Sequence, residues 1–241
     1  MTEAEIDVSA DPAALAKRVA EWLVEQVEAT AGVCRISLSG GSTPRVLYTL
    51  LAAEPLRSRM PWDRLALFWG DERFVPPDDK DSNYRMTREA MLDHVPLQPD
   101  QIHRMPTDGS PEEAAQAYED LLKRVYGGDT LDPARPFFDI TLLGMGPDGH
   151  TASLLPDSNV LDERSRWVAA VSQGRPEVRL TLTYPLIDSS RIVAFLLNGK
   201  EKAKAFARIR TGDTGLPAAR VAPVGKLLWF VDRAVLTGSQ D

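Results

Sequence analysis

Apolar residues follow two alternating spacings along the chain. Segments with the spacing of an amphipathic helix alternate with short, continuous apolar runs of the kind that form buried strands. The first helical segment begins at Asp11-Pro12, where an N-cap acid precedes a proline suited to the first turn, and ends near Gly32. Its apolar stripe consists of Leu15, Val19, Trp22, Leu23 and Val27. This alternation predicts crossover units around a largely parallel sheet.

The other elements follow from the same two patterns. Strands are predicted at 34–39, 65–69, 137–143, 166–171, 178–183, 191–197 and 227–231. Further helices are predicted from Pro44 to about Ala53, and over 83–92, 110–126 and 200–209, the third starting with a capping box of Ser110 and Glu113. No linker, repeat or low-complexity tract divides the chain, so residues 1–241 are expected to form a single α/β domain with a mostly parallel sheet flanked by helices.

A small-residue turn, Ser39-Gly40-Gly41-Ser42-Thr43-Pro44, follows the strand at 34–39. Its residues let the backbone approach an anion closely, and the helix after it presents free N–H groups. The alternative is an ordinary strand-to-helix turn with Thr43 as N-cap. The turn is not a P-loop, which needs a lysine after its second glycine, and it holds no nucleophile-elbow serine.

A charged segment, Asp71-Glu72-Arg73, follows the strand at 65–69 as a loop. Charges next to a buried strand are costly unless they are paired or used. Arg73 is suited to bind a carboxylate, a phosphate or a developing oxyanion, and Asp71 or Glu72 is expected to hold the Arg73 side chain in place. The alternative is an internal salt bridge that binds no ligand. Arg179 and Lys202 suggest surface charges if taken alone, but with Arg73 they would form a positive pocket for an anionic substrate.

A glycine-rich turn, Gly144-x-Gly146-x-x-Gly149, follows the strand at 137–143. It formally matches a dinucleotide-binding fingerprint. We reject that interpretation because the carboxylate of Asp148 would face the pyrophosphate, and no acid ends the next strand to bind a ribose. The alternative, a tight turn that needs glycine, explains the glycines but not the dense Asp-Gly-His-Thr that follows.

His150 differs in position from the other two histidines. It follows the carboxyl end of an inner strand, where open α/β sheets bind ligands, and a histidine there is suited to act as a base near neutral pH. His94 lies at a predicted helix end and His103 in a polar connecting segment. Neither has another candidate catalytic residue beside it in the sequence. His150 is therefore the candidate base.

Composition restricts the partners. The 35 acidic and 28 basic residues give a net charge of −7, which disfavours nucleic acid and membrane surfaces. Three scattered histidines and Cys34, a candidate inert core residue, offer no zinc-type spacing, so no metal is expected. The lone cysteine, the lack of a signal-like start and the absence of an apolar run of ~18 residues predict a cytoplasmic protein.

Together these motifs resemble the 6-phosphogluconolactonase family. The resemblance is carried, in order, by LSGGSTP (38–44), WGDERFVP (69–76), DSNYR (81–85), LLGMGPDGHTASLLP (142–156), RLTLT (179–183), GKEKA (199–203) and LLWFVD (227–232). It implies a modified Rossmann-like α/β fold shared with the glucosamine-6-phosphate deaminases. It also implies hydrolysis of 6-phosphoglucono-1,5-lactone to 6-phosphogluconate in the oxidative pentose phosphate pathway, without metal or cofactor. We expect a monomer whose partner is this small phosphosugar lactone.

The resemblance also implies roles for individual residues. His150 would be the general base, with Asp148 and Gly149 setting its loop, and Arg73 would stabilise charge on the substrate or oxyanion. The residues that would surround the ligand and its phosphate are Gly40, Gly41, Ser42, Thr43, Asp71, Arg179 and Lys202. The chain departs from the family at Leu155, often phenylalanine, and at 175–178, where adjacent prolines are common and where Arg175 becomes a candidate second cation near the phosphate.

Two other functions compete with the lactonase. One is a sugar-phosphate deaminase or isomerase on the same fold; the related deaminases continue their histidine loop with Ile-Ala-Phe-Asn-Glu, whereas this chain has Thr151-Ala152-Ser153-Leu154-Leu155 and lacks the acid of their proton relay. The other is a sugar-phosphate sensor without chemistry. His150, Arg73 and the glycine turn argue against the sensor, and turnover distinguishes it.

Overall fold

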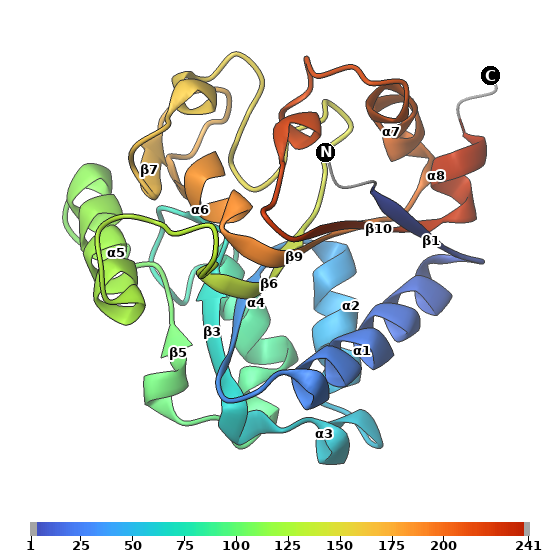
Figure 1. Ribbon diagram of the computed structural model, residues 1–241, viewed down its shortest axis with the longest axis horizontal. Helices are drawn as coiled ribbons and strands as arrows, with labels where there is room; N and C mark the ends of the chain where they lie inside the picture. The colour runs from blue at the N-terminus through green and yellow to red at the C-terminus, as the bar shows by residue number, and fades with distance from the viewer. Residues whose placement is uncertain (1–3, 239–241) are drawn as a thin grey trace.

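A parallel sheet forms the centre of the computed structural model, which describes residues 4–238 (Figure 1). The seven strands lie in the order β1-β10-β9-β6-β2-β3-β5, and every neighbouring pair is parallel. They are β1 (Glu5–Ser9), β2 (Cys34–Leu38), β3 (Leu65–Trp69), β5 (Ile102–His103), β6 (Phe138–Leu143), β9 (Ser190–Leu197) and β10 (Lys226–Asp232). The predicted α/β fold with a mostly parallel sheet flanked by helices is confirmed.

Helices cover both faces of this sheet, as a parallel sheet requires. In Figure 1, α1 and α2 lie on one side of the sheet and α6 and α7 on the other. The helices are α1 (Pro12–Ala29), α2 (Ser42–Leu51), α3 (Leu56–Arg59), α4 (Asn83–Ala90), α5 (Pro111–Tyr126), α6 (Tyr184–Asp188), α7 (Ala203–Arg210) and α8 (Arg233–Thr237). Short 3-10 turns lie at Trp62–Arg64, Leu92–His94, Pro99–Gln101, Asn159–Asp162, Lys200–Lys202 and Pro217–Arg220.

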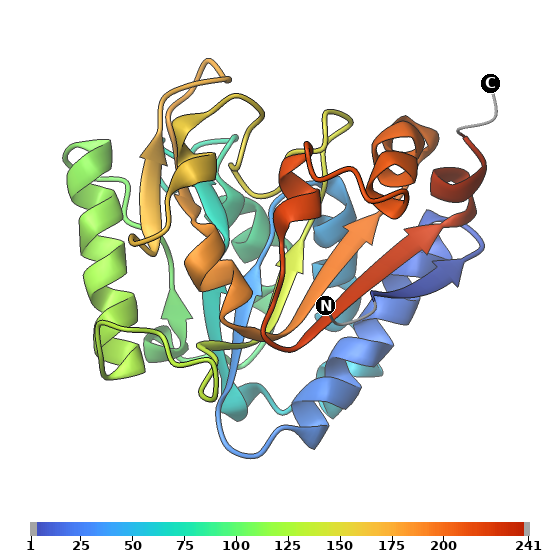
Figure 2. The same ribbon diagram turned by 45° about the horizontal axis from the view of Figure 1, so that its top comes forward.

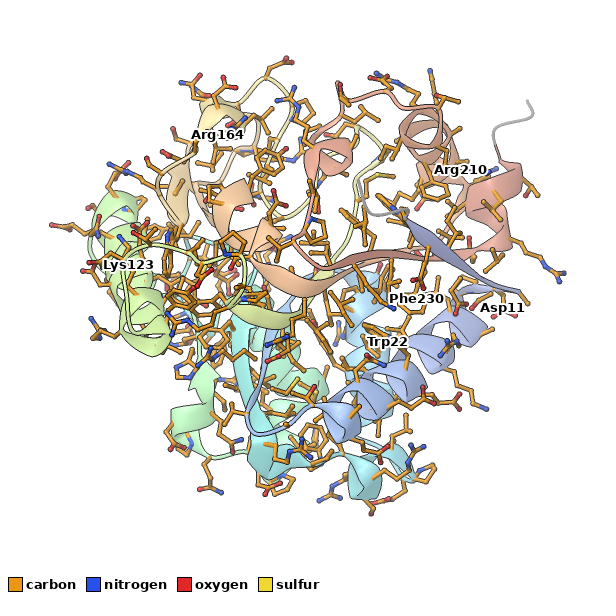
Figure 3. The ribbon with its side chains drawn as sticks, viewed as in Figure 1. Asp11, Trp22, Lys123, Arg164, Arg210 and Phe230 are labelled. Atoms are coloured by element: carbon orange, nitrogen blue, oxygen red, sulfur yellow. The ribbon has the colours of Figure 1, made fainter. Side chains whose placement is uncertain are left out.

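The caps of the long helices agree with the sequence. The Asp11 side chain accepts the N–H of Ala14 at 2.8 Å, and Ser110 with Glu113 forms the predicted capping box of α5. The predicted stripe of α1 is buried, and Trp22 packs on Phe230 of β10 with ring centroids 5.0 Å apart (Figure 3). These contacts fix α1 against the sheet.

A second, three-stranded sheet lies beside the main one, in the antiparallel order β4-β8-β7. It consists of β4 (Asp71–Arg73), β7 (Val168–Val171) and β8 (Arg179–Leu182). The segment 71–73 is therefore a strand rather than the predicted loop, and 166–171 and 178–183 do not belong to the parallel sheet. The physical reason is the short connection 172–178, because parallel strands need a crossover of about a dozen residues or more.

Several element bounds also differ from the sequence prediction. Strand β1 was not predicted, because its only apolar residues, Ile6 and Val8, are exposed at the sheet edge. Helix α2 begins at Ser42, with Gly41 at the N-cap, so Thr43 lies inside the helix and is not its cap. His103 lies in β5, stacked on Phe68, rather than in a connecting segment. Among residues 4–238, no helix is long and apolar enough to span a membrane.

Glu119 fastens the small sheet to α5. Its buried carboxylate accepts the N–H groups of Trp167 at 2.8 Å and Val168 at 3.1 Å. Its other oxygen pairs with Lys123 at 2.7 Å, and the Lys123 ammonium lies 5.6 Å from the Trp167 ring centroid. The start of β7 is thus tied to the helix by a charge-assisted network.

Replacing Glu119→Ala should lower the free energy of unfolding by about 2–4 kcal/mol, because two buried N–H groups lose their acceptor. Asp120→Ala, at the next and exposed position of α5, should change it by less than about 0.5 kcal/mol. Urea unfolding of both variants measures the difference. Equal effects would show that Glu119 contributes no more than a surface charge.

Candidate active site

A cavity of about 270 Å³ opens at the carboxyl ends of β2, β3, β6 and β9. In Figure 2 the arrows of β2, β6 and β9 point toward the same edge of the sheet. Of the predicted site residues, those that line this cavity are Gly40, Gly41, Ser42, Thr43, Asp71, Arg73, His150, Arg179 and Lys202. Asp148 and Gly149 do not line it, although they belong to the same loop as His150. The structure therefore brings together segments that are far apart in the sequence.

The glycine turn joins β2 to α2 at the cavity wall. Gly41 has a φ of +107°, a conformation that favours glycine, and it offers no side chain to cap α2. The first N–H groups of the helix are therefore available to an anion. Tyr48, completely buried, holds the strand end: its hydroxyl donates to Ser39 O at 2.8 Å and accepts the Ser39 N–H at 3.0 Å.

Glu72 organises the segment between β4 and α4. Its carboxylate accepts the N–H groups of Arg73 at 2.8 Å, Asn83 at 2.6 Å and Tyr84 at 2.8 Å, and the Ser82 hydroxyl at 3.1 Å. Burial raises the pKa of Glu72, and the backbone donors oppose that effect. The prediction that Asp71 or Glu72 holds the Arg73 guanidinium is wrong, since these carboxylates bind other donors. Arg73 instead donates to the carbonyl of Asp81 at 2.6 Å.

Asn83 lines the cavity and was not identified from the sequence. Its amide nitrogen donates to Asp71 O at 2.9 Å and Asp71 Oδ1 at 3.3 Å, while Ser153 donates to Asp71 Oδ2 at 2.7 Å. The amide oxygen of Asn83 fills the space where a side chain on Gly40 would begin. The available signal was its position immediately after Ser82, which caps α4. Asp71 and Asn83 therefore present a fixed pair of polar groups to a ligand.

The loop after β6 folds back on itself and presents His150. Gly146 N donates to His150 O at 2.8 Å, and a Cβ on Gly146 would lie only 2.1 Å from His150 Nδ1. Gly149, with φ +80°, is buried against Leu216, so it shapes the loop from behind. Gly146 is thus required by the position of the imidazole, and Gly149 by its positive φ and its contact with Leu216.

Asp148 hydrogen-bonds to the imidazole of His150, with 2.5 Å between Oδ1 and Nδ1. Burial raises the pKa of Asp148, but the hydrogen bond and charge of His150, with a contribution from Arg175, lower it overall. The carboxylate orients the ring so that Nδ1 faces Asp148 and Nε2 is free for chemistry.

Two arginines stand side by side on the small sheet. Arg73 and Arg179 are direct partners in the β4–β8 register. Arg179 is buried and forms an ion pair with Glu177. The Nε atoms of both arginines are buried without a hydrogen-bond partner among the described residues. Adjacent cations repel each other, so this pair favours an anion in the cavity.

Arg175 lies on the loop between β7 and β8. The sequence suggested a cation near the phosphate, but Arg175 does not line the cavity. Its Nη2 contacts Asp148 Oδ2 at 3.1 Å instead and lies 3.4 Å from His150 Nδ1. The ordering of this loop was not visible in the sequence because it depends on that contact.

Lys202 is positioned by a turn at the end of β9. Gly199, with φ +89°, donates its N–H to both oxygens of Asp232, at 3.1 and 3.3 Å, and its carbonyl accepts the Lys202 N–H at 3.2 Å. Asp232 also caps α8, accepting the Val235 N–H at 3.0 Å. Asn198, whose side chain accepts the Thr43 hydroxyl at 3.1 Å, and Glu201 line the cavity and were not predicted.

The described residues thus assemble a base, three cations and free N–H groups around one small cavity. Within residues 4–238, no cluster of three or more histidine, cysteine, aspartate or glutamate side chains is arranged to hold a metal ion. A histidine oriented by a carboxylate can deprotonate water, and fixed cations can bind a phosphate or stabilise an oxyanion. The arrangement is suited to hydrolysis of a small anionic substrate.

Comparison with known proteins is consistent with this chemistry. A family model described as glucosamine-6-phosphate isomerases/6-phosphogluconolactonase matches residues 10–229. A 6-phosphogluconolactonase of Nostoc sp. is 38% identical over 237 residues, 95% of each chain, and one of Synechocystis sp. is 40% identical over 221 residues, 90% and 87% of the two chains. The solved 6-phosphogluconolactonase of Trypanosoma cruzi superposes with a TM-score of 0.86 at 32% identity, covering 98% of this chain and 97% of that one.

The fit between Gly40 and Asn83 is testable. Gly40→Ala places a Cβ 1.9 Å from Asn83 Oδ1, and Asn83 is held by Asp71, so we expect a loss of about 1–3 kcal/mol in the free energy of unfolding. Gly144→Ala is the matched control, because its Cβ would meet only Ser39 Oγ at 3.9 Å.

Urea unfolding measures both variants, and Asn83→Ala in the Gly40→Ala background should recover part of the loss. Equal stability of Gly40→Ala and Gly144→Ala would contradict the close packing described for the turn.

Proposed function

Because the chain belongs to the glucosamine-6-phosphate isomerase/6-phosphogluconolactonase family, we propose that it hydrolyses 6-phosphoglucono-1,5-lactone to 6-phosphogluconate in the pentose phosphate pathway. The observation that carries the proposal is the 2.5 Å contact between Asp148 and His150 at a cavity lined by Arg73, Arg179 and Lys202. A base oriented in this way beside several cations suits an anionic substrate with a hydrolysable carbonyl.

His150 is the general base in this proposal. Asp148 accepts a hydrogen bond from the protonated Nδ1, and Nε2 is then unprotonated and can take a proton from water. The resulting hydroxide oxygen attacks the lactone carbonyl carbon, and the carbonyl oxygen becomes an oxyanion near Arg73. When the ring C–O bond breaks, the departing oxygen takes the proton back from the imidazolium. The product is an open-chain acid, and the imidazole is regenerated.

The phosphate binds at the other end of the cavity. We assign it to the turn of Gly40, Gly41, Ser42 and Thr43, with Lys202 and Arg179 as its cations. The free N–H groups at the start of α2 support this assignment. A phosphate remote from the carbonyl supplies binding energy that orients the reacting carbon.

The sugar hydroxyl groups lie between these two ends. Asn83 Nδ2 donates to Asp71 Oδ1 at 3.3 Å and both residues line the cavity, which supports hydrogen bonds donated by the sugar hydroxyl groups to Asp71 and to the Asn83 amide oxygen. The reaction needs neither a metal nor an organic cofactor, since the base, cations and N–H groups are supplied by the chain. We further propose that the chain acts in the cytoplasm as a single-domain monomer.

A deaminase on the same fold is not favoured. The relatives compared above are named 6-phosphogluconolactonases, and residues 151–155 hold no acid for a proton relay. In that segment Ser153 is used to bind Asp71.

The discriminating experiment supplies freshly generated 6-phosphogluconolactone to the purified protein and measures acid release above the spontaneous rate. We expect catalysed lactone opening and no ammonia from glucosamine 6-phosphate. Ammonia release without lactone opening would instead assign the deaminase, and binding of the phosphosugar without either turnover would assign the sensor.

His150→Ala should lower kcat by about 10²–10⁴-fold while 6-phosphogluconate still binds, because the base acts mainly in the transition state. His94→Ala, far from the cavity lining, should retain activity. Steady-state kinetics and product-binding calorimetry measure the two effects. Loss of activity in parallel with loss of folding would identify a structural histidine.

Lys202→Ala should raise KM about 10-fold or more with a smaller change in kcat, since a charge-assisted contact to phosphate is worth ~1.5–3 kcal/mol. Lys204→Ala, an exposed lysine of α7, is the matched control and should leave KM unchanged. An unchanged KM in Lys202→Ala would remove this residue from the phosphate site.

A further inference from the structure

The loop between β7 and β8 reaches the back of the catalytic histidine. Arg175 Nη2 lies 3.1 Å from Asp148 Oδ2 and 3.4 Å from His150 Nδ1. Asp148 Oδ1 faces the same imidazole nitrogen at 2.5 Å. Each carboxylate oxygen therefore has its own partner, the imidazole on one side and a guanidinium on the other.

This arrangement restrains the carboxylate. The Asp148 side chain is 39% exposed, and His150 holds only its Oδ1, through Nδ1 at 2.5 Å and through the His150 N–H at 3.2 Å. Arg175 restrains rotation of the carboxylate because it holds Oδ2 while Oδ1 remains on Nδ1. The Arg175 guanidinium is itself anchored, since Nη1 donates to Gly174 O at 3.0 Å.

The same loop serves both halves of the site. Glu177, two residues after Arg175, pairs with the cavity arginine Arg179. Phe74 N donates to Val178 O at 2.9 Å, which fastens the loop to the end of β4. The loop that carries the Arg175 guanidinium is therefore held by contacts to β4 and β8.

Arg175 donates to the carboxylate rather than to the imidazole. If Nδ1 carries the proton donated to Asp148, the guanidinium at 3.4 Å cannot donate to it. The other charged groups of the cavity, Asp71, Arg73, Arg179, Glu201 and Lys202, form no hydrogen bond or ion pair with His150 among the described residues.

We propose that Arg175 is a positioning residue for the base: it holds Asp148 on His150 and so keeps the imidazole in its working orientation. The inference rests on the proposed role of His150. Arg175 thereby acts through Asp148 without touching the substrate.

Arg175→Gln tests the charge, because it retains a hydrogen-bond donor and removes the cation. We expect kcat to fall about 3–10-fold with KM changed less, because Asp148 then holds the imidazole less firmly. Arg175→Lys, which restores the cation, should recover most of the lost kcat.

Arg191→Gln is the matched control. Arg191 also pairs with an aspartate, Asp139 at 3.2 Å, but it lies at the amino end of β9, away from the cavity. Its loss removes one positive charge and one ion pair and should leave kcat and KM unchanged. The difference in kcat between the unmodified protein and Arg175→Gln should also shrink at high salt, because the Arg175 side chain is 35% exposed.

An NMR spectrum separates this inference from the proposed function. The chain has three histidines, so the His150 imidazole signals are identified by their loss in His150→Ala. The signal of the His150 Nδ1 proton, which is hydrogen-bonded to Asp148, should weaken or move upfield in Arg175→Gln and stay unchanged in Arg191→Gln. An unchanged signal in Arg175→Gln would overturn the role of Arg175, even with reduced activity. Full activity in His150→Ala would instead overturn the base assignment, whatever the spectrum gives.

Discussion

The parallel alignment of β2, β3, β6 and β9 is the constraint on which the site depends. Strands that run side by side in one direction end at one edge, so the segments that follow them must meet there. The glycine turn, the Asp71–Arg73 segment, the His150 loop and the Asn198–Lys202 turn converge for this reason. Apolar side chains that fill both faces of the sheet set the strand register and thus the position of each loop.

Two buried carboxylates near the cavity, those of Glu72 and Asp232, bind backbone N–H groups. Glu72 accepts three N–H groups around the start of α4, and Asp232 accepts those of Gly199 and Val235. Because these acids are occupied, they do not neutralise the cavity cations. Glu177 pairs with Arg179, but among residues 4–238 no carboxylate forms an ion pair with Arg73 or Lys202. Two cations therefore stay available to an anion in a chain with a net charge of −7.

The sequence predicted the parts of the fold that depend on local pattern. Buried strands such as 65–69 and 137–143 stand out as apolar runs, and the caps of α1 and α5 are readable from Asp11 and Ser110. The sequence did not reveal β1, which is an exposed edge strand, or the antiparallel pairing of β4 with β8. Both depend on neighbours that are distant in the chain.

The same distinction applies to the site. His150 and the glycine turn were predicted because each follows an inner strand. Asn83 and Asp232 were missed because their importance comes from partners across space, Asp71 and Gly199. For Arg175 the sequence offered only a candidate cation near the phosphate, because the charge is visible in the sequence but the carboxylate that it meets is fixed only by the folded loop.

The most direct test of this account is a crystal structure of the protein with bound 6-phosphogluconate. The account predicts the phosphate on the N–H groups of residues 41–43 and on Lys202, with the C1 carboxylate within hydrogen-bonding distance of His150 Nε2. A ligand bound in the reverse orientation, or outside the cavity at the ends of β2, β3, β6 and β9, would contradict it.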